Sequence, residues 1–298
     1  MCSNKWFIIK SNLFLFISKM TISICTIYAK RVKNLQNLVK GLTMLKHQPA
    51  ELAIVCMDDE LPELPITKFP IKSTRIDRVN GKLPLSEARN TALSMISTEK
   101  VIFLDVDCIP GHNIIPIFDY LLDKEDAIYS GSVKYLPENW EFNHWTIDDL
   151  APISEFHPVQ GQPVYPPDIK PHPYELFWSL CFAMNKTTFK KLGMFEEIYT
   201  GYGGEDTDLA FKARKANIPH YKVGALAYHQ YHMSCQPPLN HIEDIVTNSK
   251  IFYDRWNELP MGAWLKSFKE RGYISMGKGK DISILKLPSN QEVQECVV

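Results

Sequence analysis

The stretch Val101-Ile102-Phe103-Leu104-Asp105-Val106-Asp107-Cys108-Ile109-Pro110 decides how the rest of the chain is interpreted. Its four leading apolar residues predict a short strand that is buried on both faces. The strand ends in two carboxylates, Asp105 and Asp107, at the edge where open α/β sheets bind ligands. Carboxylates placed there suit Mg²⁺ or Mn²⁺, which in turn suit a diphosphate. Because Asp is also common in turns, a strand-to-helix turn capped by aspartates is an equal alternative at this point.

The composition is that of an ordinary globular protein. The 298 residues are 45% hydrophobic and 22% charged, enough for one large domain or two modest ones. A formal net charge of −1 gives no sign of a nucleic-acid partner. Seven scattered cysteines without a CxxC pair favour a reducing compartment and argue against a zinc site. We therefore expect a cytoplasmic protein, with a peripheral association with a membrane left open.

Residues 1–19 are interpreted as an N-terminal extension. Their two apolar runs are interrupted by Lys10, Ser11 and Asn12, and each is shorter than the roughly 20 residues of a membrane-spanning helix. No clear small-residue site for signal-peptide cleavage follows them. An interfacial anchor and an extension upstream of a true start at Met20 are the two alternatives. The second is favoured because the first recognisable strand begins directly after Met20.

Strand and helix patterns alternate in the first half of the chain. Strands are expected at 21–27, 52–56, 76–79, 101–104 and 127–135, and helices at 32–45, 85–96 and 113–122. This alternation predicts an α/β fold with a Rossmann-like, mostly parallel central sheet flanked by helices. Right-handed crossovers bring the strand ends to one edge. Asp58, Arg89 and Asp105 are therefore expected to share one crevice.

The second half of the chain is more irregular. Dense prolines and interleaved aromatic residues over 137–173 exclude a regular helix or an interior strand. We interpret this segment as a lid or binding loop, with a surface excursion without a role as the alternative. A strand is expected within 174–183, a helix at 187–192, a strand at 223–228, and C-terminal helices at 242–256 and 261–270. Residues 277–298 have no clear period and are expected to form a loose tail.

A glycine-rich segment, Tyr199-Thr-Gly-Tyr-Gly-Gly-Glu-Asp-Thr-Asp208, precedes a helical pattern. Its three glycines allow unusual backbone torsions and a close approach to a ligand. The acidic residues Glu205, Asp206 and Asp208 fall where the helix begins, a position at which the helix dipole favours negative charge. Stabilisation of the first helical turn is therefore the alternative to a chemical role.

Three separate motifs, Asp105-Val106-Asp107, Gly203-Gly204-Glu205-Asp206 and the pair His229/His232, together resemble the GT-A-fold glycosyltransferases. The first strand through the DxD motif resembles family 2. The GYGGED segment resembles the carboxy-terminal half of the β-1,4-galactosyltransferases and the chondroitin-polymerase-type enzymes. The resemblance implies a GT-A domain over 20–240, with a nucleotide-sugar half (20–135) and an acceptor and catalytic half (136–240). C-terminal helices and a tail follow over 241–298.

The resemblance also implies the activity and the cofactor. It indicates a metal-dependent, inverting enzyme that moves a sugar from a UDP-sugar to a hydroxyl of a glycan or another acceptor. Asp107, His229 and His232 are the implied ligands of Mn²⁺ or Mg²⁺. The galactosyltransferases carry Met-x-x-His where this chain has His-x-x-His, which leaves open whether one histidine or both bind. A cation held there would neutralise the charge that grows on the diphosphate leaving group.

The remaining roles are carried over residue by residue. The implied donor-binding residues are Thr26, Tyr28, Arg31, Asp58, Arg89, Asp105 and Asp107. Asp206 is the implied general base, which takes the proton of the acceptor hydroxyl, and Glu205 orients the acceptor. The implied acceptor-binding residues are Tyr202, Gly203, Gly204 and Trp178. The plainer alternatives are a solvated helix charge for Arg89, a turn residue for Asp58 and core packing for Trp178.

Two rival functions were weighed against this one. A nucleotidyltransferase on a similar sheet is expected to carry an early glycine-rich phosphate loop, and the sequence has none. A non-catalytic carbohydrate-binding relative could retain Tyr202, but it has no reason to keep Asp107, Asp206 and His232 together. We therefore favour the transferase.

Overall fold

The computed structural model describes residues 22–142, 144–157, 159, 164–165 and 168–297. The expected N-terminal extension, with the choice between an anchor and an upstream extension, lies outside the described residues. Among the described helices, none combines the length and the apolar character needed to cross a membrane.

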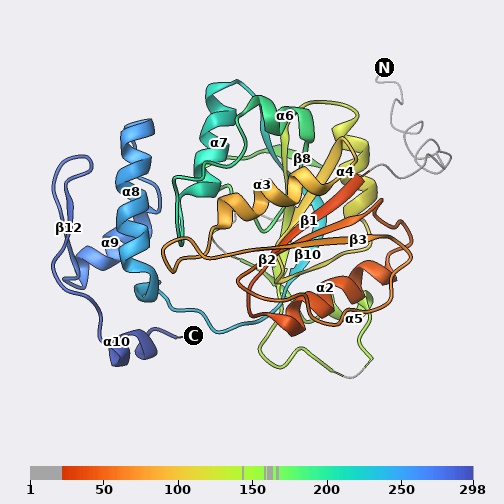
Figure 1. Cartoon of the computed structure of the whole chain (residues 1–298), viewed down its shortest axis with the longest axis horizontal. Coiled ribbons are helices and arrows are strands. Elements are labelled where there is room, and N and C mark those ends of the chain that lie inside the picture. Colours follow the sequence, from red (N-terminus) through yellow and green to blue (C-terminus); the bar gives the residue numbers. More distant parts are fainter. Residues whose placement is uncertain (1–21, 143, 158, 160–163, 166–167, 298) are drawn as a thin grey trace, which may run out of the picture.

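The core of the fold is a ten-stranded mixed sheet (Figure 1). Eight strands follow the order β3-β2-β1-β4-β9-β6-β10-β5, while β7 pairs with β6 and β8 with β10. Their bounds are β1 Ile22–Tyr28, β2 Leu52–Met57, β3 Ile71–Ile76, β4 Lys100–Leu104, β5 Cys108–Pro110, β6 Ile128–Tyr135, β7 Glu155–Phe156, β8 Ile169–Pro171, β9 Cys181–Asn185 and β10 His220–His229. The strands β3, β2, β1 and β4 are parallel, and β9 enters antiparallel between β4 and β6. The predicted α/β fold with a mostly parallel sheet is confirmed.

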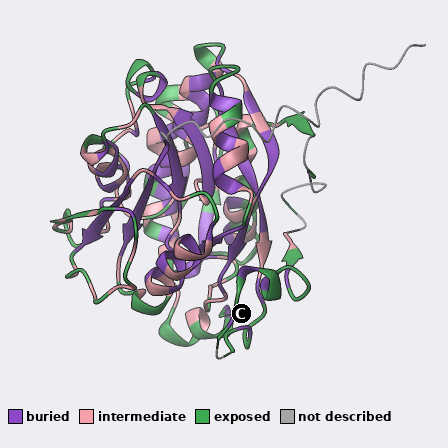
Figure 2. Cartoon of the chain, turned by 90° about the vertical axis from the view of Figure 1, so that its right-hand side faces the viewer, coloured by how far each residue is buried: buried purple, intermediate pink, exposed green. Residues whose placement is uncertain are grey.

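Helices cover both faces of this sheet. Their bounds are α2 Val32–Met44, α3 Leu85–Met95, α4 Ile114–Leu122, α5 Ile147–Leu150, α6 Lys186–Lys191 and α7 Glu205–Lys215. The helices α2 and α4 pack on one face, where Leu38 and Phe118 belong to the same buried cluster as Ile24, while α3, α6 and α7 cover the other. The strands β1, β2 and β4 are buried along their whole length, as expected for parallel strands between two helical layers. Figure 2 shows the buried residues following the sheet, with exposed residues at the periphery.

A smaller C-terminal unit lies beside this α/β layer (Figure 1). It contains α8 Ile242–Trp256, α9 Gly262–Glu270, β11 Ile274–Met276, β12 Ile282–Ile284 and α10 Asn290–Glu295, after the 3₁₀ turn η3 Leu239–His241. The expected loose tail over 277–298 is wrong in its described part, since β12 pairs with β11 and Ser289 caps α10. Ile282 is buried in the core of this unit. A three-residue strand and a six-residue helix are too short to give a clear period in the sequence.

Three further boundaries differ from the expectation. The third strand runs over 71–76 rather than 76–79, because it is an edge strand whose residues Lys72, Ser73 and Arg75 are polar and exposed, so it has no apolar run. The strand expected within 174–183 begins only at Cys181, after the 3₁₀ turn η2 Tyr174–Leu176. The described part of 137–173 is mainly irregular, but it contains the four-residue α5 and the short strands β7 and β8.

Asp208 joins helix α7 to the C-terminal helix α8. Its fully buried carboxylate accepts hydrogen bonds from Arg255 Nε (2.7 Å), Trp256 Nε1 (2.7 Å) and the Tyr199 hydroxyl (3.2 Å). Asp208 therefore has a structural role, which differs from the expected alternative of stabilising the first helical turn because its carboxylate bonds residues of α8.

We expect Asp208→Ala to lower the free energy of unfolding by about 3 kcal/mol, because it leaves the Arg255 and Trp256 donors without a buried acceptor. Urea denaturation measures the change. Asp254→Ala is the matched control, since Asp254 is an exposed carboxylate of α8 that forms a surface ion pair with Lys280. Equal stability of the two variants would contradict the anchoring role.

Candidate active site

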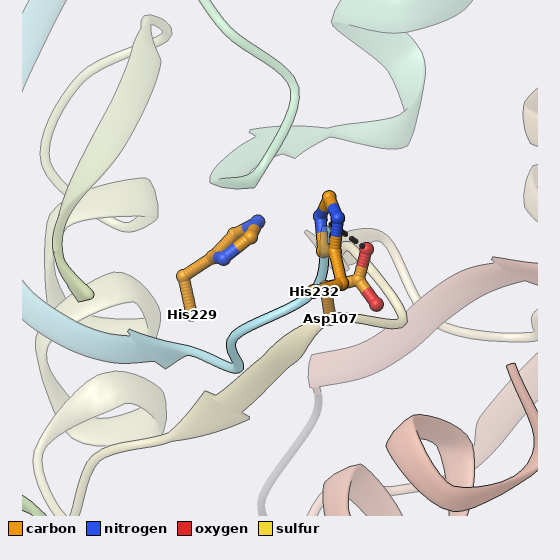
Figure 3. A group of neighbouring side chains, drawn as sticks. All are labelled: Asp107, His229 and His232. Carbon is orange, nitrogen blue, oxygen red and sulfur yellow. Dashed lines mark ion pairs between the residues drawn. The ribbon is translucent and has the colours of Figure 1, made fainter. Parts of the chain in front are cut away.

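Asp107, His229 and His232 meet at the carboxyl edge of the sheet (Figure 3). Asp107 lies in the loop between β4 and β5, His229 ends β10, and His232 follows three residues later. The antiparallel pairing of β5 with β10 sets His229 opposite Cys108, the neighbour of Asp107. One ligand atom from each of the three residues lies within 4.8 Å of the others. The structure therefore brings together three side chains that are far apart in the sequence.

The chemistry of this cluster fits a divalent cation. His232 Nε2 lies 3.4 Å from Asp107 Oδ2. The His229 ring is buried and stacks on Tyr135 with 4.6 Å between ring centroids. Burial lowers the pKa of His229 to about 4, so its imidazole is neutral at neutral pH, as a metal ligand must be. One carboxylate and two imidazoles are a donor set that Mn²⁺ and similar ions accept.

The amino end of α2 faces the Asp107 carboxylate. Arg31, which directly precedes α2, forms an ion pair with Asp107 Oδ2, and Asn34 Nδ2 donates to Asp107 Oδ1 at 2.8 Å. A helix amino end together with an arginine is favourable for an anion such as a diphosphate. Asn34 was not predicted from the sequence, although its spacing of three from Arg31 places both on one helix face.

Gln230 fixes the loop that carries Asp107. Its backbone N–H donates to the Asp107 carbonyl at 2.6 Å, and its side chain donates to the Asn34 carbonyl at 3.0 Å. Its Oε1 accepts from Asn37 Nδ2 at 3.0 Å. This buried residue lies between the two histidines in the sequence, and its position there was the only signal that could have pointed to it.

Asp105 lies between the cluster of Asp107, His229 and His232 and the acidic pair Glu205 and Asp206. Burial raises the pKa of Asp105, and the charge of Asp107 adds to this, while His229, Arg89 and Arg31 oppose it. Arg89 NH1 lies 2.9 Å from Glu205 Oε1, and both side chains are largely buried. Arg89 is therefore not a solvated helix charge. It ties α3 to the first residue of α7 at this edge of the sheet.

The glycine-rich loop presents Asp206 at the start of α7. Gly203 and Gly204 have φ angles of 92° and 96°, a region that side chains rarely adopt. A Cβ at Gly203 would also lie 2.5 Å from Met261 Sδ. Thr207 N–H donates to Asp206 Oδ1 at 2.7 Å. Desolvation, with the charge of Glu205 as the next cause, raises the pKa of Asp206 to about 7, although Arg89 lowers it.

Tyr202 lies close to Asp105 and to the acidic pair Glu205 and Asp206. Desolvation, followed by the charges of Asp206, Glu205 and Asp105, raises the pKa of Tyr202 to about 12, and Arg31 opposes them. Trp178 lies nearby, since the backbone of the next residue, Ser179, hydrogen-bonds the Asp206 carboxylate. The edge of Trp178 meets His157 at 5.3 Å between ring centroids, and the indole is only partly buried.

The other predicted donor-binding residues occupy different settings. Asp58 follows β2 with a φ of 58° and lies 2.9 Å from Arg78 Nε in an exposed ion pair. Thr26 and Tyr28 lie inside β1 and are 1% and 2% exposed, so the structure does not bring their side chains to the open crevice. Among the described residues, the buried Thr26 hydroxyl has no hydrogen-bond partner.

Asn248 of α8 forms hydrogen bonds with the backbone of the glycine-rich loop and was not predicted from the sequence. Its Nδ2 lies within hydrogen-bond distance of the carbonyls of Thr200 (3.1 Å), Tyr202 (3.3 Å) and Gly203 (2.8 Å). Its side chain is buried. The C-terminal unit therefore helps to set the position of this loop.

We expect Asn248→Ala to lower the turnover of the proposed reaction about tenfold and the free energy of unfolding by about 2 kcal/mol, because the loop carbonyls lose their donor. Turnover is measured at a temperature at which circular dichroism shows the variant to be fully folded. Asn240→Ala, at an exposed position nearby, is the control and should match the wild type. Wild-type turnover in Asn248→Ala would show that the loop is held by other contacts.

Comparisons with known proteins address the family and the fold. Residues 167–234, which include the glycine-rich loop and both histidines, match a family whose model is described as the N-terminal domain of galactosyltransferase. No curated protein matches the chain.

Among solved structures, the chain is similar to S. aureus TarS 1-349, with 13% identity and a TM-score of 0.53 over 83% of this chain and 69% of that one. A second S. aureus TarS structure gives 12% identity and a TM-score of 0.52, over 84% of this chain and 42% of that one. GalNAc-T7 with UDP, GalNAc and Mn²⁺ gives 15% identity and a TM-score of 0.49, over 84% and 54%. The chain thus spans about half of the GalNAc-T7 chain and less than half of the second TarS chain. The fold of the chain is of the GT-A type, and residues 167–234 resemble the galactosyltransferase domain that the family model describes.

Proposed function

We propose that this protein is a metal-dependent glycosyltransferase that moves a sugar from a UDP-sugar to a hydroxyl of a glycan or another acceptor, with inversion at the transferred carbon. The observation that carries the proposal is the meeting of the Asp107, His229 and His232 cluster with the Gly203–Asp206 loop at one edge of the sheet. The family match over 167–234 supports it, because it spans the loop and both histidines.

In the donor half, Asp107, His229 and His232 would hold Mn²⁺ or Mg²⁺. When bound, such a cation neutralises the charge that develops on a diphosphate leaving group. Arg31 at the start of α2 contacts Asp107 and would bind the same diphosphate. The proposed remaining donor contacts are the ribose for Asp105, the uracil for Asp58, and the donor more generally for Arg89. Thr26 and Tyr28 are left out of this set because their side chains are buried in β1.

In the acceptor half, the Asp206 carboxylate removes the proton of the attacking hydroxyl. Glu205, fixed by its ion pair with Arg89, orients the acceptor. Gly203 and Gly204 let the acceptor approach the backbone, and Tyr202 and Trp178 flank it. A single base placed opposite the leaving group gives direct displacement, which inverts the configuration of the sugar carbon.

The division of the chain follows from the same proposal. We assign the GT-A domain to 20–240, with a nucleotide-sugar half (20–135) and an acceptor and catalytic half (136–240), and a C-terminal unit to 241–298. The separate hydrophobic core of the C-terminal unit, which includes Ile242, Leu265 and Phe268, supports the last boundary.

A screen of UDP-sugars tests the proposed function. The full chain is incubated with each UDP-sugar and Mn²⁺, with and without saccharide acceptors, and UDP release is measured. We expect at least one donor to release UDP, and this release to increase when a suitable acceptor is added. The absence of UDP release with every donor and acceptor would contradict the function.

The reaction should depend on pH through Asp206. Its raised pKa of about 7 means that the basic carboxylate form is present above this pH and is lost as the pH falls. We expect kcat/KM to fall about tenfold per pH unit below about pH 7. Arg89 lowers this pKa, so Arg89→Gln should move the midpoint to higher pH, whereas Arg214→Gln on the outer side of α7 should not. A profile that is flat between pH 5 and 8 would contradict Asp206 as the base.

A further inference from the structure

Three aromatic rings from separate segments meet beside the glycine-rich loop. The ring of Tyr202 stacks on His241 with 4.5 Å between centroids and an interplanar angle of 19°. Trp264 of α9 lies 5.8 Å from Tyr202 at an angle of 31°. We call Tyr202, His241 and Trp264 the aromatic platform. His241 and Trp264 belong to the C-terminal unit, outside the segment that matches the galactosyltransferase family model.

The aromatic platform is partly open to solvent. Tyr202 is 39% exposed and the His241 side chain 38%, while Trp264 is partly buried. Large rings that pack only to fill a core are normally covered to a greater extent, as Phe252 and Phe268 are in this same unit. Part of the aromatic surface of this stack is therefore exposed at the protein exterior.

Several contacts fix the position of the aromatic platform. Asp244 of α8 accepts a hydrogen bond from the Tyr202 N–H at 3.2 Å, and its other oxygen lies 2.5 Å from Lys82 Nζ. A Cβ at Gly201 would lie 2.1 Å from Asp244 Oδ2, so this close approach requires glycine. Asn248 holds the Tyr202 carbonyl from the same helix. The backbone that carries the Tyr202 ring is thus held before any ligand binds, which lowers the entropic cost of binding.

The platform is also adjacent to the proposed chemistry. The charges of Asp206, Glu205 and Asp105 all act on the Tyr202 hydroxyl, so this ring lies among the acidic groups. A ligand lying on the platform would have hydroxyl groups close to the Asp206 carboxylate. Flat aromatic surface next to a few fixed polar groups suits a ligand with one apolar face and many hydroxyls. A pyranose ring has this character, because its C–H groups gather on one face and its hydroxyls point outward.

We propose that Trp264 and His241, together with Tyr202, bind a pyranose ring of the acceptor, so that the C-terminal unit determines acceptor specificity and the acceptor is a saccharide. This inference rests on the proposed function only in so far as it calls the bound saccharide an acceptor. The existence of a saccharide-binding platform does not rest on it, since binding can be measured without turnover.

Saturation-transfer difference NMR on the full chain tests the platform, with the methyl glycosides of glucose, galactose and N-acetylglucosamine as probes, with and without UDP and Mn²⁺. We expect at least one glycoside to bind to the wild type and its signal to fall at least fivefold in Trp264→Leu. Leucine keeps apolar bulk on α9 but removes the flat ring, so the variant retains the packing of the helix. Trp264→Ala should show an equal or larger loss.

Tyr120→Ala is the matched control, because Tyr120 is an exposed aromatic residue on α4, away from the platform; it should bind as the wild type does. Unchanged binding in Trp264→Leu, or no glycoside bound by the wild type under any condition, overturns the inference. In the transfer assay, Trp264→Leu should raise the KM for the acceptor about tenfold and change the KM for the donor by less than about twofold. A third outcome is possible: a glycoside binds in a way that depends on Trp264, but no donor releases UDP. This result would refute the proposed function, while the aromatic platform would remain a saccharide-binding site.

Discussion

Replacing Asp206 with asparagine should lower kcat for sugar transfer by about 10³-fold, because an amide cannot accept the proton of the attacking hydroxyl. Asparagine keeps the shape of the side chain and an oxygen that can still accept the hydrogen bond from Thr207. The donor site does not include this side chain, so we expect the KM for the UDP-sugar to change little. Steady-state kinetics with the best donor and acceptor from the screen provide the measurement.

The matched control for this variant is Asp148→Asn, at an exposed position of α5 that forms an exposed pair with His112. It should retain wild-type kinetics. If Asp206→Asn keeps most of its turnover while remaining folded, the base is another residue. In that case the raised pKa of Asp206 reflects its burial beside Glu205 and no role in proton transfer.

Asp107→Ala should lower the rate of sugar transfer by about 10³-fold and remove its dependence on Mn²⁺. Asp107 supplies the carboxylate of the cluster that it forms with His229 and His232. Transfer is measured over a range of Mn²⁺ concentrations. Asp107→Asn is a second variant that keeps the volume and, through its one carbonyl oxygen, can still accept from either Asn34 or Arg31, and we expect it to lose as much activity. Activity that still rises with Mn²⁺ in both variants would place the cation at other residues.

The central part of the fold could be predicted from the sequence because β1, β2 and β4 are buried on both faces. Such strands must be apolar along their length, and the helices between them must carry an apolar stripe, so each pattern is local. The edge strand β3 was placed five residues too late, because one exposed side breaks its apolar run. The paired strands β11 and β12 are three residues each and were missed for want of a period.

The candidate site could be predicted only as a set of separate motifs. Asp107 and the two histidines lie more than 120 positions apart, and it is the pairing of β5 with β10 that brings them together. No local pattern encodes this pairing. The resemblance to a family supplied the expectation that these residues meet, and the structure supplies the geometry.

The residues that hold the site in place were not predicted for a related reason. Asn34, Gln230 and Asn248 are single amides in helices or loops, and their hydrogen bonds reach segments distant in the sequence. An isolated amide has no periodic or spacing signal. The ion pair of Arg89 with Glu205 is similar, since each residue was named from the sequence but their contact was not.

The central claim is that Asp107, His229 and His232 converge on one divalent cation that serves a nucleotide diphosphate. Isothermal titration calorimetry of UDP into the full chain, with Mn²⁺ and after its removal by chelation, tests this claim most directly. The account predicts that UDP binds at least tenfold more tightly with Mn²⁺ and that Asp107→Ala and His229→Ala each abolish this gain. Equal affinity for UDP with and without Mn²⁺ in the wild type, or an undiminished gain in both variants, would contradict it.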